Sequence, residues 1–291
     1  MARPPAPVGK GIITPAPVRP AVTEVDRAEL ATLFRVALGV HRVVRDAAGS
    51  PHRADIVAMS PGGSPTEELD RLAEREVLRT LEAEGVDWNV LSEEIGRVDR
   101  GGSRTLVVDP IDGTSNALRQ LPFSTVSLAL GTNDLDGIEV GVVRDLDRGT
   151  TYWGVRGGGA YRDGRAIRTR PRRPKGEVVF LNLGHRAGER ATRLAAAVRR
   201  VRSLGCASLE MMMVAQGAAD AYLFENRDPS LNLRATDVAA AYRILLEAGG
   251  GVARADGGPI GTMPLDLSTR TSVFAWGDAE VGRAFAGGTF P

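Results

Sequence analysis

Two acidic side chains stand directly after an apolar run in the segment VVDPIDGTSNAL, residues 107–118. The run that ends at Val108 predicts a buried strand, and Pro110 restricts φ at the first position of a turn. Asp109 and Asp112 are therefore expected close together at the end of that strand. Two fixed carboxylates repel each other, and a hard divalent cation such as Mg²⁺ removes the repulsion. The alternative is an Asx turn, in which the acids only accept hydrogen bonds from backbone amides.

The residues that follow favour an anion beside that cation. Gly113 lets another group approach the backbone closely. The amides of Gly113, Thr114 and Ser115 would form an anion-binding site if these residues begin a short helix. A cation site next to an anion-binding site indicates a phosphate ligand.

A third acid lies on the apolar face of a predicted helix. At roughly 100° per residue, Asp70 falls within the arc of side chains that this helix turns toward the core. The apolar members of the arc are Leu69, Ala73, Val77 and Leu81. A buried carboxylate needs a cation, several donors or a proton. A salt bridge to one of the many arginines is the plainer interpretation.

Two further positions add acids at the ends of predicted elements. Glu93 and Glu94 close the run WNVLSEE, so alternation along the strand sends one side chain to each side. Paired glutamates are also typical of a solvated surface. Asp237 opens the predicted helix TDVAAAYRILLEAGG, where the helix dipole stabilises an acid. Thr236 can cap this helix while Asp237 projects beyond its end, so both a capping role and a metal ligand stay open.

The helices that must position these acids begin after a proline-rich start. Residues 1–22 carry six prolines and predict a flexible arm with polyproline II character, either a tether or a partner-binding segment. Residues 23–44 have the apolar spacing of an amphipathic helix. A second helix is predicted in SPTEELDRLAEREVLRTLEAEG. Its signals are Ser64 as the cap, Pro65 in the first turn, Glu67 completing a capping box, and Gly85 as the end.

The predicted strands change their arrangement near Arg170. Short β runs before the stretch RTRPRRPKG, with Asp163-Gly164 as a hairpin tip, predict a mostly antiparallel sheet. After that stretch strands alternate with helices, one of which is ERATRLAAAVRRV. The pattern predicts the α/β class, with an α+β domain at residues 23–170 and an α/β domain at residues 171–291. A site that uses Asp237 and the earlier acids would lie at their junction.

Composition narrows the possible functions. The formal net charge of +1 and the mixed signs along the chain argue against nucleic-acid and membrane-surface partners. Of 37 Lys+Arg two are lysines, which leaves 35 arginines, a bias more typical of codon usage than of arginine-specific recognition. The single cysteine excludes an internal disulfide and fits a reducing compartment, so we expect the cytoplasm. The three histidines have no ligand spacing, so no zinc site is predicted.

Several motifs in the same order resemble the inositol monophosphatase family of lithium-sensitive, Mg²⁺-dependent sugar phosphatases. They are SEE, DPIDGTSN, and LRATDVAAA followed by EAGG, within residues 65–250. GGSPTEELD, DGTSNA with LPFSTVSLAL, and RATD are most similar to archaeal-type enzymes that act on both fructose 1,6-bisphosphate and inositol 1-phosphate. The resemblance implies a layered αβαβα sandwich, a phosphoric monoester hydrolase and a homodimer.

The resemblance also implies two principal metal sites that share one carboxylate. The first Mg²⁺ would be held by Glu93, Asp109 and the carbonyl of Ile111. The second would be held by Asp109, Asp112 and Asp237. Asp109 would then bridge the two ions.

A cleavage without a covalent intermediate follows from the same resemblance. Asp70, with Glu93, would serve a weaker third ion or orient the attacking water, and Thr114 would help to polarise that water. The phosphate would lie on the amides of Gly113 and Thr114. One metal would activate the water and another would stabilise the departing alkoxide.

Five residues are expected on the substrate side of the site. Gly205, Cys206 and Ala207 correspond to a segment that faces the sugar, with close helix packing as the plain alternative. Arg227 and Arg234 lie in ENRDPSLNLR, a longer stretch than its inositol-specific counterpart. They would hold a distal phosphate through forked hydrogen bonds, or they are simply two more among many arginines.

Two other functions stay open. A relative that removes phosphate from a 3'-phosphorylated adenine nucleotide would need an aromatic or apolar slot for the base. A non-catalytic regulatory or binding protein would use the Pro-rich arm with this fold as a scaffold, and the intact set of acids argues against it. The family often has Trp-Asp where this chain has Thr236-Asp237, a departure close to the substrate.

Overall fold

The structure is a computed structural model that describes residues 22–61, 63, 65–173 and 176–288. The predicted Pro-rich arm, apart from Val22, and the predicted cap Ser64 lie outside the described residues. The described helices are α1 (Glu24–Ala47), α2 (Glu68–Ala83), α3 (Thr114–Leu118), α4 (Glu189–Ala197), α5 (Ala207–Ala215), α6 (Ala235–Glu247) and α7 (Ala279–Ala286), with the short helix η1 (Pro229–Leu231) before α6.

The larger sheet has eight strands in the order β10-β9-β8-β7-β6-β5-β3-β4. They are β3 (Asn89–Ser92), β4 (Gly96–Val98), β5 (Thr105–Asp112), β6 (Thr125–Gly131), β7 (Ile138–Asp145), β8 (Thr151–Val155), β9 (Gly159–Arg162) and β10 (Arg165–Ile167). Neighbouring strands are antiparallel except β3 and β5. The predicted mostly antiparallel sheet is confirmed, as is the hairpin tip at Asp163-Gly164, where both φ angles are positive.

The second sheet has five strands in the order β12-β11-β13-β15-β14. They are β11 (Val178–Leu181), β12 (Arg200–Arg202), β13 (Ala221–Phe224), β14 (Gly251–Ala253) and β15 (Val273–Trp276). The helix predicted for ERATRLAAAVRRV is wrong at its end, because α4 stops at Ala197 and β12 pairs in parallel with β11. Sheet pairing outweighs the helical propensity of the arginines there.

Helix α2 begins three residues later than its sequence signals predict. Pro65–Glu67 forms strand β2, which pairs antiparallel with β1 (Ile56–Met59). Glu67 is therefore the N-cap and not the third helical residue. Asp70 takes that third position, and its carboxylate accepts a hydrogen bond from the Glu67 amide over 3.3 Å. The pairing with β1 holds this segment extended, so the helix cannot start at Pro65.

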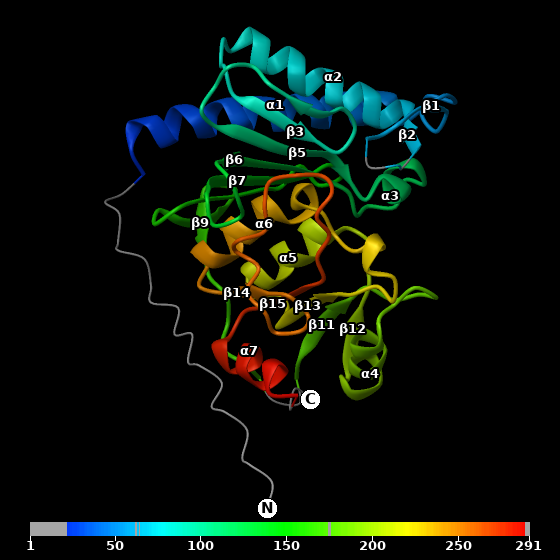
Figure 1. The fold of residues 1–291 in the computed structure, drawn as a ribbon, viewed down its shortest axis with the longest axis vertical. Helices are drawn as coiled ribbons and strands as arrows, with labels where there is room; N and C mark the ends of the chain where they lie inside the picture. The colour runs from blue at the N-terminus through cyan, green and yellow to red at the C-terminus, as the bar shows by residue number, and fades with distance from the viewer. Residues whose placement is uncertain (1–21, 62, 64, 174–175, 289–291) are drawn as a thin grey trace, which may run out of the picture.

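The elements stack in five layers (Figure 1). Helices α1 and α2 cover one face of the larger sheet, and α5 and α6 lie between the two sheets. Helices α4 and α7 cover the outer face of the second sheet. This arrangement is the predicted layered αβαβα sandwich, so the fold class is confirmed.

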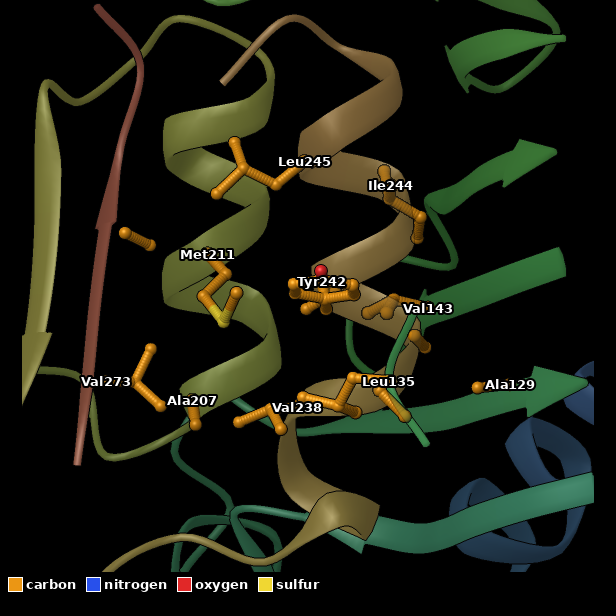
Figure 2. Close-up of a cluster of buried hydrophobic side chains, with 14 of the residues drawn as sticks. Ala129, Leu135, Val143, Ala207, Met211, Val238, Tyr242, Ile244, Leu245 and Val273 are labelled. Atoms are coloured by element: carbon orange, nitrogen blue, oxygen red, sulfur yellow. The ribbon is translucent and has the colours of Figure 1, made fainter. Parts of the chain in front are cut away.

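The apolar cluster between the two sheets draws on both halves of the chain (Figure 2). Figure 2 shows Met211 of α5, Tyr242 of α6 and Val143 of β7 within it. The larger sheet therefore buries its inner face against helices from the C-terminal half. Separate domains at residues 23–170 and 171–291 stay a prediction.

Candidate active site

Strand β5 ends in a buried, irregular turn that carries three of the predicted site residues. All 8 residues of Thr105–Asp112 are buried, and the register with β6 shifts between Asp109 and Asp112. Such an irregularity turns side chains away from regular alternation. One carboxylate oxygen of Asp109 accepts from the amide of Ile111 over 3.0 Å. The local Asx bond is therefore present, and it leaves the second oxygen of Asp109 for another ligand.

Three acids converge where β3, β5 and α6 meet. Glu93, Asp109 and Asp237 each have an oxygen within 4.8 Å of the other two. Within the described part of the chain, no other group of three potential metal ligands lies this close together. Burial, and then the charge of Glu93, raises the pKa of Asp109 well above its usual range. The same two causes raise the pKa of Asp237 to about 8.

This three-acid cluster fits a hard divalent cation. Its donors are carboxylate oxygens, the ligands that Mg²⁺ takes in proteins. The burial and mutual repulsion that raise these pKa values would both be offset by a bound cation. Asp109 has 4% of its surface exposed, whereas the Glu93 side chain has 23%, so the cluster is open to solvent on the Glu93 side.

Asp112 lies outside the three-acid cluster and contacts the start of α5. One of its carboxylate oxygens accepts from the Ser208 amide over 2.7 Å and from the Ser208 hydroxyl over 2.6 Å. The other oxygen has a single, longer contact of 3.3 Å with the amide of Ala207. The dipole of α5 also stabilises a carboxylate at this end of the helix. The role of Asp112 in a second metal site stays a prediction, with the less engaged oxygen as the ligand.

Asp70 and Thr114, predicted as catalytic partners, are in direct contact. The Thr114 hydroxyl lies 3.1 Å from a carboxylate oxygen of Asp70 and 2.9 Å from the carbonyl oxygen of Ile111. Burial is the main cause that raises the pKa of Asp70 to about 8. A hydroxyl carries one proton, so Thr114 donates to one of these two acceptors at a time.

Gly113 closes β5 and is the N-cap of α3, with φ of 87°. A Cβ at this position would lie 2.8 Å from the carbonyl oxygen of Phe123, so the backbone angle and the space both require glycine. The amides of Thr114 and Ser115, in the first turn of α3, have no acceptor within the helix. The predicted phosphate site on Gly113, Thr114 and Ser115 stays a prediction that this geometry permits.

The segment at Gly205, Cys206 and Ala207 packs against the DGTSN turn. The Asn116 side chain donates to the carbonyl of Leu204 over 2.8 Å, which joins α3 to this loop. Cys206 is buried, and its thiol lies 3.3 Å from the Asp112 carboxylate. The contacts of Cys206 are those of close packing. A sugar-facing role for the three residues stays a prediction.

The two arginines predicted to hold a distal phosphate have different surroundings. Arg234 is the N-cap of α6 and has 1% of its surface exposed. Its guanidinium donates to the Glu93 carboxylate, and its amide donates to Asp237 over 2.6 Å. Arg227 is exposed, and its Nε donates to the carbonyl of Ala187 over 3.1 Å. Arg234 thus contacts two of the clustered acids, and a shared phosphate-binding role with Arg227 stays a prediction.

Sequence reasoning did not identify two charged residues near this site. Glu210 is a buried acid of α5 whose carboxylate accepts from the Leu204 amide over 2.6 Å. Glu210 lies among apolar helical neighbours in SLEMMMVA, as Asp70 does on its own helix, so the same pattern indicates a buried acid. Arg270 lies close enough to Glu93 and Asp237 for their charges to act on its pKa. No sequence signal separates Arg270 from the other arginines.

Comparison with known proteins identifies the family. The sequence model of the inositol monophosphatase family matches residues 26–281. The chain belongs to this family. It is 34% identical to the fructose-1,6-bisphosphatase/inositol-1-monophosphatase of Methanothermobacter thermautotrophicus over 85% of this chain and 91% of that protein.

Solved structures and a further relative extend this result. A Pyrococcus horikoshii protein described as similar to inositol-1 monophosphatase aligns with a TM-score of 0.77 and 26% identity, over 89% of this chain and 97% of that one. The bifunctional NADP phosphatase/NAD kinase of Methanococcus maripaludis is 28% identical over 82% of this chain and 45% of that protein.

Membership of the inositol monophosphatase family makes the chain a phosphoric monoester hydrolase of a Mg²⁺-dependent family. The acidic cluster of Glu93, Asp109 and Asp237 agrees with that requirement. In the described ranges, no helix has the length and apolar character needed to span a bilayer.

Proposed function

We propose that this chain releases inorganic phosphate from fructose 1,6-bisphosphate, inositol 1-phosphate, or both. The name of the relative from Methanothermobacter thermautotrophicus includes both activities. The observation that carries the proposal is the convergence of Glu93, Asp109 and Asp237 near the contact between Asp70 and Thr114. In this arrangement the acids that would bind the cation lie near the Thr114 hydroxyl, which can orient a water molecule.

Two to three Mg²⁺ ions are proposed. Glu93, Asp109 and the carbonyl of Ile111 would hold one, and Asp109 would share a second with Asp112 and Asp237. Asp70 would serve a weaker third. Bound Mg²⁺ supplies an activated water and stabilises negative charge on the leaving oxygen.

The chain's own groups bind the phosphate and position the water. The amides of Thr114 and Ser115 would donate hydrogen bonds to the phosphate oxygens, since the helix gives these amides no other acceptor. Asp70, as the acceptor of the Thr114 hydroxyl, would hold that hydroxyl toward the attacking water. Burial raises the pKa of the Cys206 thiol well above its usual range, which supports a reaction without a cysteine nucleophile.

A nucleotide phosphatase is the second candidate function. The relative from Methanococcus maripaludis, named as an NADP phosphatase, favours it. Phosphate release from NADP and from a 3'-phosphorylated adenine nucleotide, compared with release from the sugar phosphates, separates the two candidates. A cytoplasmic location and a homodimer stay predictions, and size-exclusion chromatography tests the second.

The test is phosphate release by the full chain on these four compounds, with and without Mg²⁺. We expect Mg²⁺-dependent turnover, and Asp112→Asn should lower it by about 100-fold or more with the fold retained. The control is Asp46→Asn, at an exposed acid that pairs with Arg45. Unchanged turnover of Asp112→Asn would remove Asp112 from the site. Absence of release from all four compounds would favour a non-catalytic binding protein.

A further inference from the structure

Two loop segments meet in a short antiparallel bridge beside the three-acid cluster. Leu233 and Thr271 exchange backbone hydrogen bonds of 3.0 and 2.8 Å. In an antiparallel pair, the residues next to such a doubly bonded pair face each other at close range, with their side chains on one side. The bridge therefore sets Arg234 opposite Arg270.

Acids of the three-acid cluster act on both arginines. Two like charges opposite each other are unfavourable unless anions compensate them. Arg234 is buried and bonded to Glu93. Glu93 and Asp237 also act on Arg270, whose pKa is nevertheless lowered, first by burial and then by Arg234. Glu93 and Asp237 thus compensate the positive charges of both arginines.

Arg270 keeps most of its hydrogen-bonding capacity. Its Nη1 donates to the carbonyl of Asn232 over 3.3 Å, and the structure shows no second hydrogen bond from this guanidinium to the residues it describes. A guanidinium has five N–H donors in a planar fork. The residue is half-buried, so its side chain stays partly accessible.

Charge balance then favours an anion at this position. A cation at the three-acid cluster would neutralise the carboxylates that compensate the two arginines. Arg270, which is half-buried, would then lose the compensation that Glu93 and Asp237 provide. A forked guanidinium binds the oxygens of a phosphate through paired hydrogen bonds.

We propose that Arg270 determines substrate specificity by binding a second phosphate, distal to the one that is cleaved, while Arg234 positions Glu93. The proposal rests on the proposed phosphatase function and adds a preference for substrates with two anionic groups. It differs from the sequence-based expectation, because Arg227 is exposed and, unlike Arg234 and Arg270, is not among the main charges that act on Glu93.

The test compares fructose 1,6-bisphosphate with inositol 1-phosphate, using the full chain with Mg²⁺. Arg270→Gln should lower kcat/KM for the bisphosphate by about 30-fold, mainly through KM, as expected for loss of hydrogen bonds to a charged group. For inositol 1-phosphate the change should stay below about 3-fold. Arg193→Met, at an exposed arginine paired with Glu189, should change neither value.

Equal losses on both substrates would overturn the proposal, because Arg270 would then support the site in general. A selective loss in Arg227→Gln but not in Arg270→Gln would overturn it as well. Should Arg270→Gln not fold, Arg270→Lys, which keeps the charge and loses the fork, must show the bisphosphate-selective loss. If the unmodified chain releases no phosphate, the proposed function fails. Calorimetric titration then tests the inference separately: Arg270→Gln must weaken binding of fructose 1,6-bisphosphate and leave binding of inositol 1-phosphate unchanged.

Discussion

Glu210 is a buried acid without a cationic partner among the described residues. Burial raises its pKa from 4.5 to about 8. The folded chain therefore keeps a proton that the unfolded chain releases, so this residue lowers stability as pH rises from about 4.5 to about 8. Glu210→Gln keeps the acceptor for Leu204 and removes the titration.

We expect Glu210→Gln and the unmodified chain to melt at similar temperatures at pH 5. At pH 8.5 the variant should melt roughly 3 °C higher, about 1 kcal/mol for a chain of this length. Melting curves across this range, without added metal, measure the difference. Because other buried acids titrate in both proteins, only the difference between the two curves reports on Glu210. A constant difference at every pH would contradict the assigned pKa.

The turn from β5 into α3 depends on one glycine. Gly113→Ala introduces strain at a positive φ and a contact of 2.8 Å with the Phe123 carbonyl oxygen. We expect it to lower the free energy of unfolding by about 3 kcal/mol. The matched control is Gly164→Ala in the β9–β10 hairpin. Its φ is also positive, but an added Cβ would have no atom within 4 Å beyond the neighbouring residues.

Gly164→Ala should cost only about 1 kcal/mol, the backbone contribution alone. Urea unfolding of both variants measures the two free energies. Equal losses would show that the contact with Phe123 relaxes at no cost. They would also show that the DGTSN turn is less constrained than its close approach to the loop before α5 indicates.

The two halves of the chain share one apolar cluster. Helix α6 packs on β6, β7 and β8, and α5 joins the same cluster. Residues 23–170 alone would expose the face of the larger sheet that α6 covers. Isolated, this fragment should aggregate or lack stable tertiary structure, although it contains all the strands of that sheet.

Near-UV circular dichroism and thermal melting of the fragment test this expectation. The full chain is the reference, and it should unfold in one cooperative transition. A fragment that melts cooperatively with native-like spectra would show instead that the predicted boundary near Arg170 separates two autonomous domains.

Several parts of the fold were predictable because their signals are local. The hairpin tip at Asp163-Gly164 follows from residues that tolerate positive φ, and the alternation of strands and helices after Arg170 predicted the α/β half. The errors lie where strand pairing overrides a local helix signal. The start of α2 was displaced by the pairing of Pro65–Glu67 with β1, and the end of α4 was displaced by the pairing of Arg200–Arg202 with β11.

The amino-acid sequence determined which groups are available to this site: acids after an apolar strand, a glycine that permits a tight turn, and a hydroxyl beside it. These are properties of neighbouring residues and of local backbone preference. Only the tertiary structure decided that Glu93, Asp109 and Asp237 converge, that Asp112 contacts the start of α5, and that Arg270 faces Arg234. These contacts join residues that are far apart in the chain. They form only when the layers pack together, so local sequence preferences cannot determine them.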